Sequence, residues 1–535
     1  MTPRRALALG GLLGALAVVA LAFATHFSLG ELGANRAKAA VAFLALALGV
    51  REARRRVPSR AAPAVAAFLA AMAIGAYYNY GNPVYEGLFH RNNVFHHFLG
   101  AKYAPELGYT RLYACVAVAQ SELSPDEEDD IAVRRMRDLA HDDIVFARDV
   151  VADPEPCKQR FTPPRWSAFV EDVRFFRGTA DREYWDAMQL DHGFNAPPPW
   201  TAFVHVVTSP FAASRQVVLT LASLDVFLCA GMFAALGWAF GWRVSCLAMI
   251  FWGCQLPANH LWVSGSLLRQ DWLFLVVLST CLLAKRRFLL AGIAFALATS
   301  LRLFPVVLLV GPVIVIALHL VRKRKLARSH LRFVAGGLLG GALVVGFSVA
   351  ILGAHAYHDF ADHIRVHERT PAANHMGLRA LFMVDWDGSM KKRIDPSSAD
   401  PLRPWREARI AQYEKAKPLF AVLALALFVP LVVVLSRRRS LWMALALSVV
   451  AVFAFMQLAS YYFAVLLLPV VLARVRLRVE RIVLAVVGTG ALVATMPALS
   501  GDDEKMFATQ TVLYLGYCVL LLGDVIVSGK RVGAQ

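Results

Sequence analysis

The sequence predicts an all-α polytopic membrane protein with about fourteen transmembrane helices. The chain has 535 residues, 58% of them hydrophobic, and long apolar runs recur along it. A bilayer core of ~30 Å needs roughly 20 apolar residues per helix, and Lys/Arg-rich connections stay in the cytoplasm. Clusters of basic residues separate the runs so that all of them can face one compartment: Arg51–Arg60, Arg243, Lys285–Arg287, Arg322–Arg328, Arg437–Arg439, Arg474–Arg481 and Lys530–Arg531.

The orientation of every helix in the membrane follows if Arg4 and Arg5 lie in the cytoplasm. The first run is then an uncleaved helix and not a signal peptide, because further hydrophobic spans follow it at once. Two runs are short, and we expect them to be re-entrant or tilted. The predicted helices cover residues 6–28, 37–50, 61–78, 213–240, 244–258, 272–284, 288–301, 304–320, 333–353, 418–436, 440–458, 461–473, 482–498 and 508–527, of which 37–50 and 272–284 are the short ones.

Two long polar stretches divide the chain into five parts. Residues 79–212 hold 20 Asp/Glu against 13 Lys/Arg, whereas the whole chain has a net charge of +18. We therefore expect a folded extracytoplasmic domain there, with anionic lipid headgroups and not nucleic acid as counter-ions of the basic remainder. The expected parts are N-terminal helices (1–78), that domain (79–212), a transmembrane core (213–353), a second outer loop (354–417) and C-terminal helices (418–535).

Two of the seven cysteines lie in the predicted outer domain, where oxidation is permitted. Cys115 and Cys157 either form a disulfide or remain thiols, and the sequence leaves both open. The other five lie in apolar runs and are expected to be packing residues.

The second outer loop contains five histidines within 21 residues. Asp359, His363 and His367 would share one helical face, which favours an interfacial amphipathic helix. The alternatives are a metal site, with His358, His363 and His367 as ligands, or a phosphate site, which the guanidinium of Arg365 favours. No cofactor is required by the sequence, although a divalent cation remains possible.

Ionisable residues at membrane depth mark a second candidate site. An unpaired charge there costs at least ~2.5 kcal/mol, so Arg269, Asp271 and Arg302 need a reason to be present. One interpretation is a cavity at the outer leaflet in which Arg269 and Arg302 bind a phosphate. The other is an ion pair between Arg302 and Asp271 that only fixes the helices.

Five short segments resemble the glycosyltransferase C superfamily, most closely the polyprenyl-phosphate-sugar enzymes of family 87. Residues 194–203 are similar to a Tyr-x-Pro-Pro-Leu element before a membrane helix. The others resemble, in the same order, a Gly-Gln pair, an Ala-Gly…Lys-x-x-Pro helix, an Asn-Gln-Ser segment and a Trp-x-His-Tyr…Pro element: 269–271, 291–305, 373–377 and 460–469.

The resemblance implies an enzyme that takes a sugar from a lipid phosphate in the outer leaflet. An Asp or Glu of the first outer loop deprotonates the acceptor, and cations hold the departing phosphate. Here the motif places Asn92 or Asn93 at the position of the acid, and asparagine cannot act as a base. The candidate bases are instead Glu86, Asp191 and Asp271. The side chains expected to contact substrate are Tyr85, Asn93, Gln270, Asn374, His375 and Tyr461.

Two other classes of function stay open at this stage. A lipid or sugar transporter would usually contain internal repeats, and a catalytically degenerate scaffold would not need converging charges. For the enzyme, the expected partners are a lipid-linked sugar donor, membrane lipid and a glycan, lipid or protein acceptor. The expected location is a bacterial inner membrane, with the site facing the periplasm or the exterior.

Overall fold

The computed structural model describes residues 2–24, 30–55, 59–81, 88–368, 370–386, 390–398, 400–437, 440–499 and 501–527. Within these ranges the chain is almost entirely helical, with two short two-stranded sheets. Seven helices of the described chain are long and apolar enough to cross a membrane. The protein is therefore an all-α membrane protein, as the sequence predicts.

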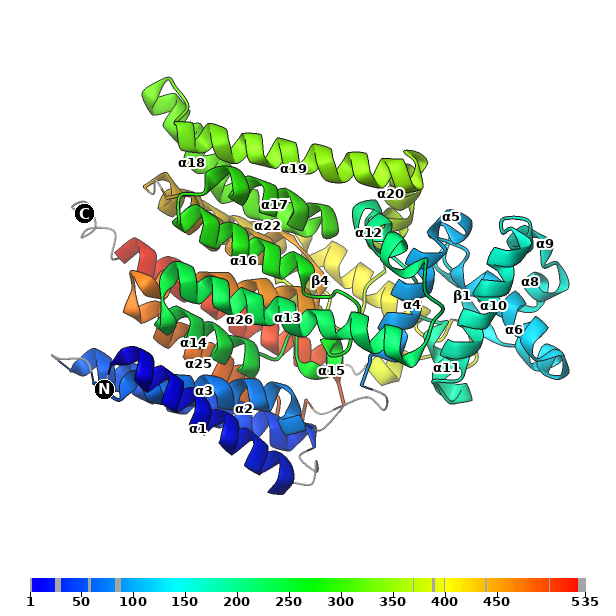
Figure 1. Ribbon diagram of the computed structural model, residues 1–535, viewed down its shortest axis with the longest axis horizontal. Coiled ribbons are helices and arrows are strands. Elements are labelled where there is room, and N and C mark those ends of the chain that lie inside the picture. The colour runs from blue at the N-terminus through cyan, green and yellow to red at the C-terminus, as the bar shows by residue number, and fades with distance from the viewer. Residues whose placement is uncertain are drawn as a thin grey trace.

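The apolar helices run side by side in one bundle (Figure 1). Every predicted apolar run coincides with a helical segment, although several are shorter than a full crossing. The segments are α1 (Pro3–Ala24), α2 (Glu31–Arg54), α3 (Ala62–Tyr77), α13 (Arg215–Phe240), α14 (Trp242–Cys254), α16 (Asp271–Ala284), α17 (Phe288–Leu301), η3 (Phe304–Leu309), α18 (Val310–Lys323), α19 (Arg328–Leu352), α22 (Arg403–Ser436), α23 (Leu441–Leu447), α24 (Val449–Phe455), η5 (Ser460–Arg474), α25 (Leu477–Val493) and α26 (Asp503–Val527).

Small residues allow α17 and α19 to approach closely. A Cβ on Gly292 of α17 would lie 2.1 Å from the Phe333 carbonyl oxygen, and one on Gly336 of α19 would lie 2.0 Å from that of Leu289. Only glycine fits at such a crossing, which is a common way for helices to pack in lipid.

A polar domain occupies the other end of the molecule, at the right of Figure 1. Its buried core lies around Phe95, Phe169 and Trp185. The buried ion pair of Lys102 with Asp172 (2.6 Å) ties its beginning to its middle. The elements are α4 (Arg91–Lys102), α5 (Ala104–Leu107), α6 (Leu112–Leu123), η2 (Pro125–Glu127), α7 (Glu128–Ala132), β1 (Arg135–Asp138), β2 (Asp143–Phe146), α8 (Arg148–Ala152), α9 (Glu155–Lys158), α10 (Pro163–Arg177), α11 (Arg182–Met188) and α12 (Pro198–Thr208), whereas η1 (Asn79–Gly81) packs on α1 and α3 in the bundle.

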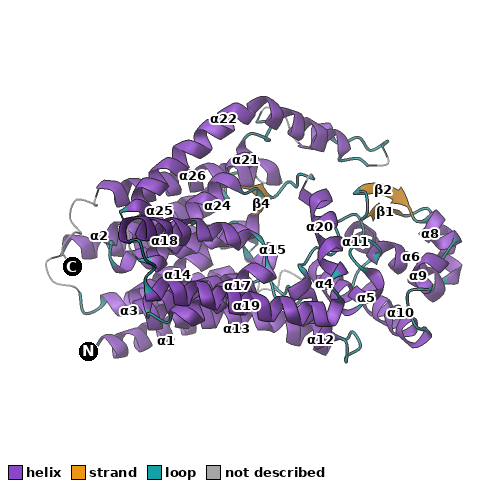
Figure 2. Ribbon diagram, turned by 90° about the horizontal axis from the view of Figure 1, so that it is seen from above, coloured by secondary structure: helices purple, strands orange, loops and turns teal. Residues whose placement is uncertain are grey.

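The second polar segment, residues 354–417, returns to the bundle through a small sheet (Figure 2). The α22 helix starts at Arg403, well before the predicted residue 418, because its first turns pack on α26: the Trp405 indole N–H donates to Glu504 Oε2 (2.9 Å). The remaining elements are α15 (His260–Val263), α20 (His355–Glu368), β3 (His375–Met376), α21 (Leu378–Leu381), η4 (Met390–Arg393) and β4 (Leu458–Ala459), with β3 antiparallel to β4.

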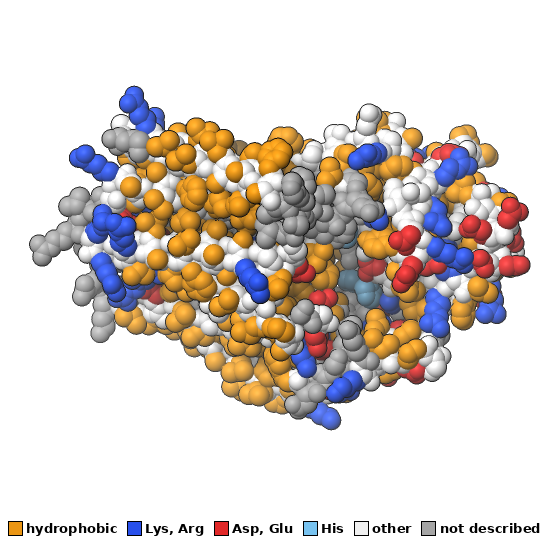
Figure 3. Space-filling view, turned by 90° about the horizontal axis from the view of Figure 1, so that it is seen from below, with side chains coloured by type: hydrophobic (Ala, Val, Ile, Leu, Met, Phe, Trp, Pro, Cys, Tyr) orange, Lys and Arg blue, Asp and Glu red, His pale blue; other side chains and the backbone are white. Residues whose placement is uncertain are grey.

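Charge is distributed unevenly along the molecule. Lys and Arg side chains gather at the end of the bundle away from the polar domain, whereas Asp and Glu gather on the polar domain (Figure 3). Between the two parts the surface is hollowed, and histidine lies in the hollow (Figure 3).

Candidate functional site

A cavity of about 510 Å³ lies where the polar domain meets the helix bundle. Five separate stretches of sequence line it: the start of α4, the end of α11 with the turn after it, α15 with the loop before α16, the segment from α20 to β3, and β4 with the start of η5. The polar lining residues are His90, Asn92, Asn93, His96, His97, Asp191, His192, Asn195, Arg269, His367, Asn374, His375 and Tyr461.

The first turn of α4 forms one wall. His90 begins the helix, and its Nδ1 accepts from the Asn93 backbone N–H (3.3 Å). The Asn93 side chain reaches the bundle, because its Oδ1 accepts from the backbone N–H of Leu267 (2.9 Å). This hydrogen bond holds the Asn93 side chain in place and joins the α4 wall to the loop that carries Arg269.

Asp191 is the carboxylate of the cavity. Its Oδ2 accepts from Asn92 Nδ2 (2.9 Å) and its Oδ1 from the backbone N–H of His192 (2.8 Å). Burial raises the pKa of this carboxyl, but His96, His192 and the two hydrogen bonds outweigh burial and hold the pKa well below its usual range. Asp191 is therefore ionised at neutral pH.

Tyr113 supports the turn that carries Asp191. Its hydroxyl lies 2.5 Å from His96 Nε2, donates to the Asp191 carbonyl (3.0 Å) and accepts from the Gly193 backbone N–H (3.1 Å). Gly193 has φ of +67°, a conformation that glycine adopts without strain. The carboxylate position is thus set by a buried hydroxyl and a sharp turn.

Asp142 connects the polar domain to the second polar segment beside the cavity. Its Oδ1 lies 3.0 Å from Arg137 Nη1 and 3.1 Å from His192 Nδ1, and its Oδ2 accepts from the Thr370 hydroxyl. Burial raises its pKa, yet His192, Thr370 and Arg137 together hold the pKa well below its usual range. Because Thr370 follows α20, this carboxylate holds the second polar segment against the polar domain.

Arg269 is the cation of the cavity. Its backbone N–H and that of Gln270 donate to the two Asp225 oxygens, both at 2.9 Å, so α13 shapes the loop before α16. The guanidinium lies over the Tyr461 ring, 4.1 Å from its centroid, and the buried Nε has no hydrogen-bond partner. A guanidinium in the lining of a cavity is suited to an anion.

Arg302 and Asp271 lie beside the cavity and not in its lining. Arg302 is 6% exposed, its guanidinium lies 5.4 Å from the Trp200 ring centroid, and its Nε has no hydrogen-bond partner. Asp271 accepts from the Trp272 backbone N–H (2.6 Å). Arg302 forms no salt bridge within the described part of the chain, so the alternative of a direct Arg302–Asp271 ion pair is not formed.

The small sheet brings the remaining wall together. His375 pairs with Ala459 across the β3–β4 ladder, and the Asn374 carbonyl accepts from the Ser460 N–H (2.8 Å). His375 Nδ1 lies 2.9 Å from Gln457 Nε2 and 3.3 Å from the Ala372 backbone nitrogen. Asn374 and Tyr461 therefore reach the same cavity from segments far apart in the chain.

The structure gathers about half of the predicted site residues. Those that line the cavity are Asp191, Arg269, Asn93, Asn374, His375 and Tyr461, together with His367. Gln270 is buried behind the lining, and Arg365 instead borders a separate groove and pairs with Asp362 (2.6 Å). Glu86 and Tyr85 lie outside the described residues.

The histidines of α20 diverge. His358 is exposed and lies 3.1 Å from Asp362, whereas His363 is buried and stacks on Tyr109 (5.6 Å between ring centroids). His367 alone reaches the cavity, where Asn195 Nδ2 lies 3.3 Å from its Nε2. In the described chain, no group of three or more His, Cys, Asp or Glu side chains is arranged to hold a metal ion.

Several cavity residues escaped the sequence analysis. His96, His192 and Asp142 act through side chains that lie far apart in sequence, so spacing alone gave no reason to group them. One local signal existed: the pairs His96-His97 and Asp191-His192 place titratable residues beside predicted site positions.

Of the two alternatives that the sequence left open for the polar-domain cysteines, the structure has the disulfide: Cys115 and Cys157 are bonded with their Cα atoms 5.4 Å apart. The other five cysteines are free and buried, as expected. Comparison of the chain with protein-family models, curated proteins and solved structures gives no match.

Proposed function

We propose that this protein is an integral membrane glycosyltransferase that moves a sugar from a polyprenyl-phosphate donor to an acceptor on the extracytoplasmic side. The observation that carries the proposal is that an ionised carboxylate, Asp191, and a cation with an unsatisfied donor, Arg269, line one cavity at the edge of the helix bundle. Transfer from a lipid phosphate needs a base for the acceptor and positive charge for the leaving phosphate.

Asp191 is the general base in this proposal. The resemblance expects an acid at Asn92 or Asn93, and Asn92 donates to the Asp191 carboxylate at 2.9 Å. The acid in this proposal is therefore Asp191, which lies in a later segment. Asn92, at the motif position where the resemblance expects the acid, holds Asp191 in place. The acceptor hydroxyl loses its proton to Asp191 as it attacks the anomeric carbon, and the bond from that carbon to the phosphate oxygen breaks.

Arg269 binds the departing phosphate. Its guanidinium lies over the Tyr461 ring, and Arg269 lines the cavity. Arg302 adds positive charge behind this position, at the end of α17. Asn374 and His375 contribute polar contacts to the sugar from the opposite wall.

An apolar groove supports a lipid-linked donor. It has a volume of about 450 Å³ and is lined by Pro197, Pro198, Leu303 and Phe360, among others, with Arg365 at its edge. Leu303 follows Arg302 directly, so a prenyl chain in the groove would bring its phosphate to the cation side of the cavity.

The arrangement in the membrane is part of the proposal. We propose about fourteen crossings, with residues 79–212 and 354–417 both extracytoplasmic in a bacterial inner membrane. The disulfide and the basic far end of the bundle support this orientation. A cysteine introduced at Asp130 should react with an impermeant reagent in intact cells, and one at Lys285 only after permeabilisation. The reverse pattern contradicts the mechanism.

The lipid-linked sugars of cells that lack this protein test the function. One polyprenyl-phosphate sugar should accumulate, and the intact gene should restore its normal level. An unchanged profile argues against the enzyme. Accumulation of the donor on the cytoplasmic side alone favours a flippase.

A further inference from the structure

We infer that the polar domain contains a second anion site, formed by Arg111 and Arg160 in a small pocket beside the outer end of α19, which binds a phosphate group. The pocket is separate from the cavity of the proposed reaction, and the inference does not depend on that reaction. Its free volume is about 60 Å³, against about 510 Å³ for the cavity, so it admits a small group and not a sugar.

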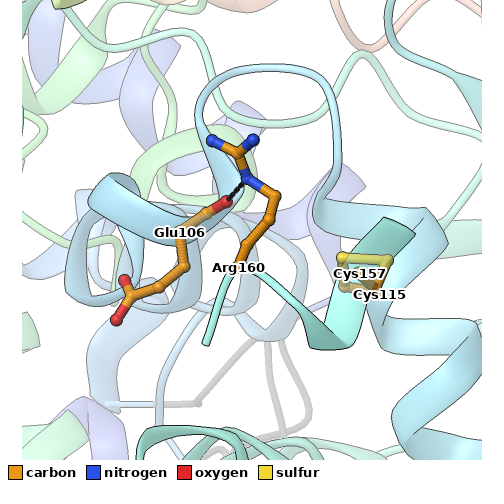
Figure 4. Close-up of a disulfide and its surroundings, with 4 residues drawn as sticks. All are labelled: Glu106, Cys115, Cys157 and Arg160. Atoms are coloured by element: carbon orange, nitrogen blue, oxygen red, sulfur yellow. Dashed lines mark hydrogen bonds between the residues drawn. A yellow bond between two sulfur atoms is a disulfide. The ribbon is translucent and has the colours of Figure 1, made fainter. Parts of the chain in front are cut away.

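Two guanidinium groups converge on this pocket. Arg160 donates from its Nε to the Glu106 carbonyl oxygen (2.7 Å), which leaves its terminal nitrogens free of that contact (Figure 4). Arg111 also lines the pocket and forms no ion pair within the described chain. Partial burial and the charge of Arg160 lower the pKa of Arg111, as expected for two like charges at close range.

The nearby acids neutralise only one of the two arginines. The Glu106 carboxylate is occupied by Arg165, whose Nε and Nη2 donate to it at 2.7 Å and 3.2 Å. The only carboxylate in the described pocket lining is Asp359, which is exposed on α20, and His355 lies beside it. The pocket therefore has one more positive charge than negative at neutral pH, which matches an anion with several oxygen acceptors.

The disulfide holds the two arginines together. Arg111 precedes α6, and Cys115 lies one helical turn further along that helix. Cys157 lies on α9, and Arg160 follows it by three residues. The crosslink therefore joins the two segments that carry the guanidinium groups (Figure 4). Without a ligand this proximity of like charges is unfavourable, and a bound phosphate makes it favourable.

The location points to the membrane surface as one source of the phosphate. Leu352, the last residue of a helix long enough to span a membrane, lines the pocket together with Ala356 at the start of α20. A lipid phosphate diester and inorganic phosphate offer the same oxygen acceptors to the arginines.

The test uses the full-length, oxidised protein. Its thermal stability is measured in detergent with increasing inorganic phosphate, and native mass spectrometry records retention of phosphatidic acid against a neutral lipid. The variants are Arg111→Gln with Arg160→Gln, the pair Arg111→Lys with Arg160→Lys, and the control Arg148→Gln, an exposed arginine of the same domain.

Wild type and control should bind at least one of the two probes, and the double Gln variant should bind it at least tenfold more weakly, with the Lys pair in between. Binding of phosphatidic acid alone assigns the site to a lipid headgroup, and binding of inorganic phosphate alone assigns it to a soluble ion. Reduction of the disulfide should weaken binding in the same way as the Gln pair. If the double Gln variant folds and binds both probes as wild type does, or if wild type binds neither, the inference is wrong.

Discussion

Replacing Asp191 with Asn tests the proposed base with little change to the structure. The two hydrogen bonds of Asp191 come from Asn92 Nδ2 and the His192 backbone N–H. The asparagine side chain of the variant keeps the second bond through its carbonyl oxygen. Asn92 can rotate its amide, because its Oδ1 is buried without a partner and would accept from the new NH₂ group. We therefore expect the variant to keep the fold, although it loses the charge interactions of Asp191 with His96 and His192.

The effect on turnover should be large. Loss of a general base typically costs ~10²–10⁴ in rate, which is about 3–5 kcal/mol of barrier at ~1.36 kcal/mol per tenfold. In the proposed complex the donor phosphate contacts Arg269 and not Asp191, so donor affinity should stay within about threefold of wild type.

The assay measures initial rates and donor dissociation constants for the protein in lipid nanodiscs, with the donor that accumulates in the deletion strain. Asp126→Asn is the matched control, because Asp126 is an exposed carboxylate of the same domain. Wild-type turnover in Asp191→Asn would refute the assignment and make Glu86→Gln the next variant. Loss of donor affinity with unchanged turnover at saturation would make Asp191 a binding residue.

Four further predictions follow from other contacts. Arg269→Gln should weaken donor binding at least tenfold, whereas Arg379→Gln, which removes an arginine stacked on Tyr413 (4.3 Å) outside the cavity, should leave donor binding unchanged. Asp142→Asn breaks a largely buried ion pair and changes the hydrogen bond from Thr370. The free energy of unfolding should fall by roughly 3 kcal/mol, and limited proteolysis near Thr370 should accelerate. An unchanged cleavage rate would contradict the connection of the segment after α20 to the polar domain by Asp142. Burial and the charge of Arg409 lower the pKa of His375 to about 3, below the unfolded value of ~6.5. The folded state therefore disfavours the protonated ring. The contribution of His375 to the free energy of unfolding is complete above pH ~6.5 and is lost as the pH falls toward 3, by up to ~1.4 kcal/mol per pH unit. The unfolding temperature of His375→Asn should therefore depend less on pH than that of wild type. Identical slopes of unfolding temperature against pH would show that His375 does not cause the pH dependence. Cys115→Ser should destabilise the polar domain by ~3–4 kcal/mol in urea, and an unchanged midpoint would show that the disulfide adds no stability.

The helices were predictable because their signal is local. Apolar length and the position of basic clusters locate each helical segment without knowledge of its neighbours, as for α13 and α19. The ends were less predictable. The early start of α22 depends on Trp405 finding Glu504, about one hundred residues later, and no local pattern encodes that contact.

The cavity was only partly predictable for the same reason. Arg269 was found because a charge at membrane depth is unusual, and Tyr461 was found from the resemblance of residues 460–469 to a family element. The support of Asp191 by Asn92 and Tyr113 joins residues separated by 99 and 78 positions, so only the fold brings them together. Arg365 was placed in the phosphate site from its residue type alone, whereas α20 turns it toward a separate groove.

The most direct measurement follows the donor itself. The purified protein in nanodiscs receives a set of short-chain polyprenyl-phosphate sugars and a candidate acceptor extract, and mass spectrometry records the release of polyprenyl phosphate. The account predicts that wild type consumes one donor and transfers its sugar, whereas Asp191→Asn binds that donor and leaves it intact. If wild type binds no donor, or binds one and moves it across a vesicle membrane without cleaving it, the protein is not a glycosyltransferase.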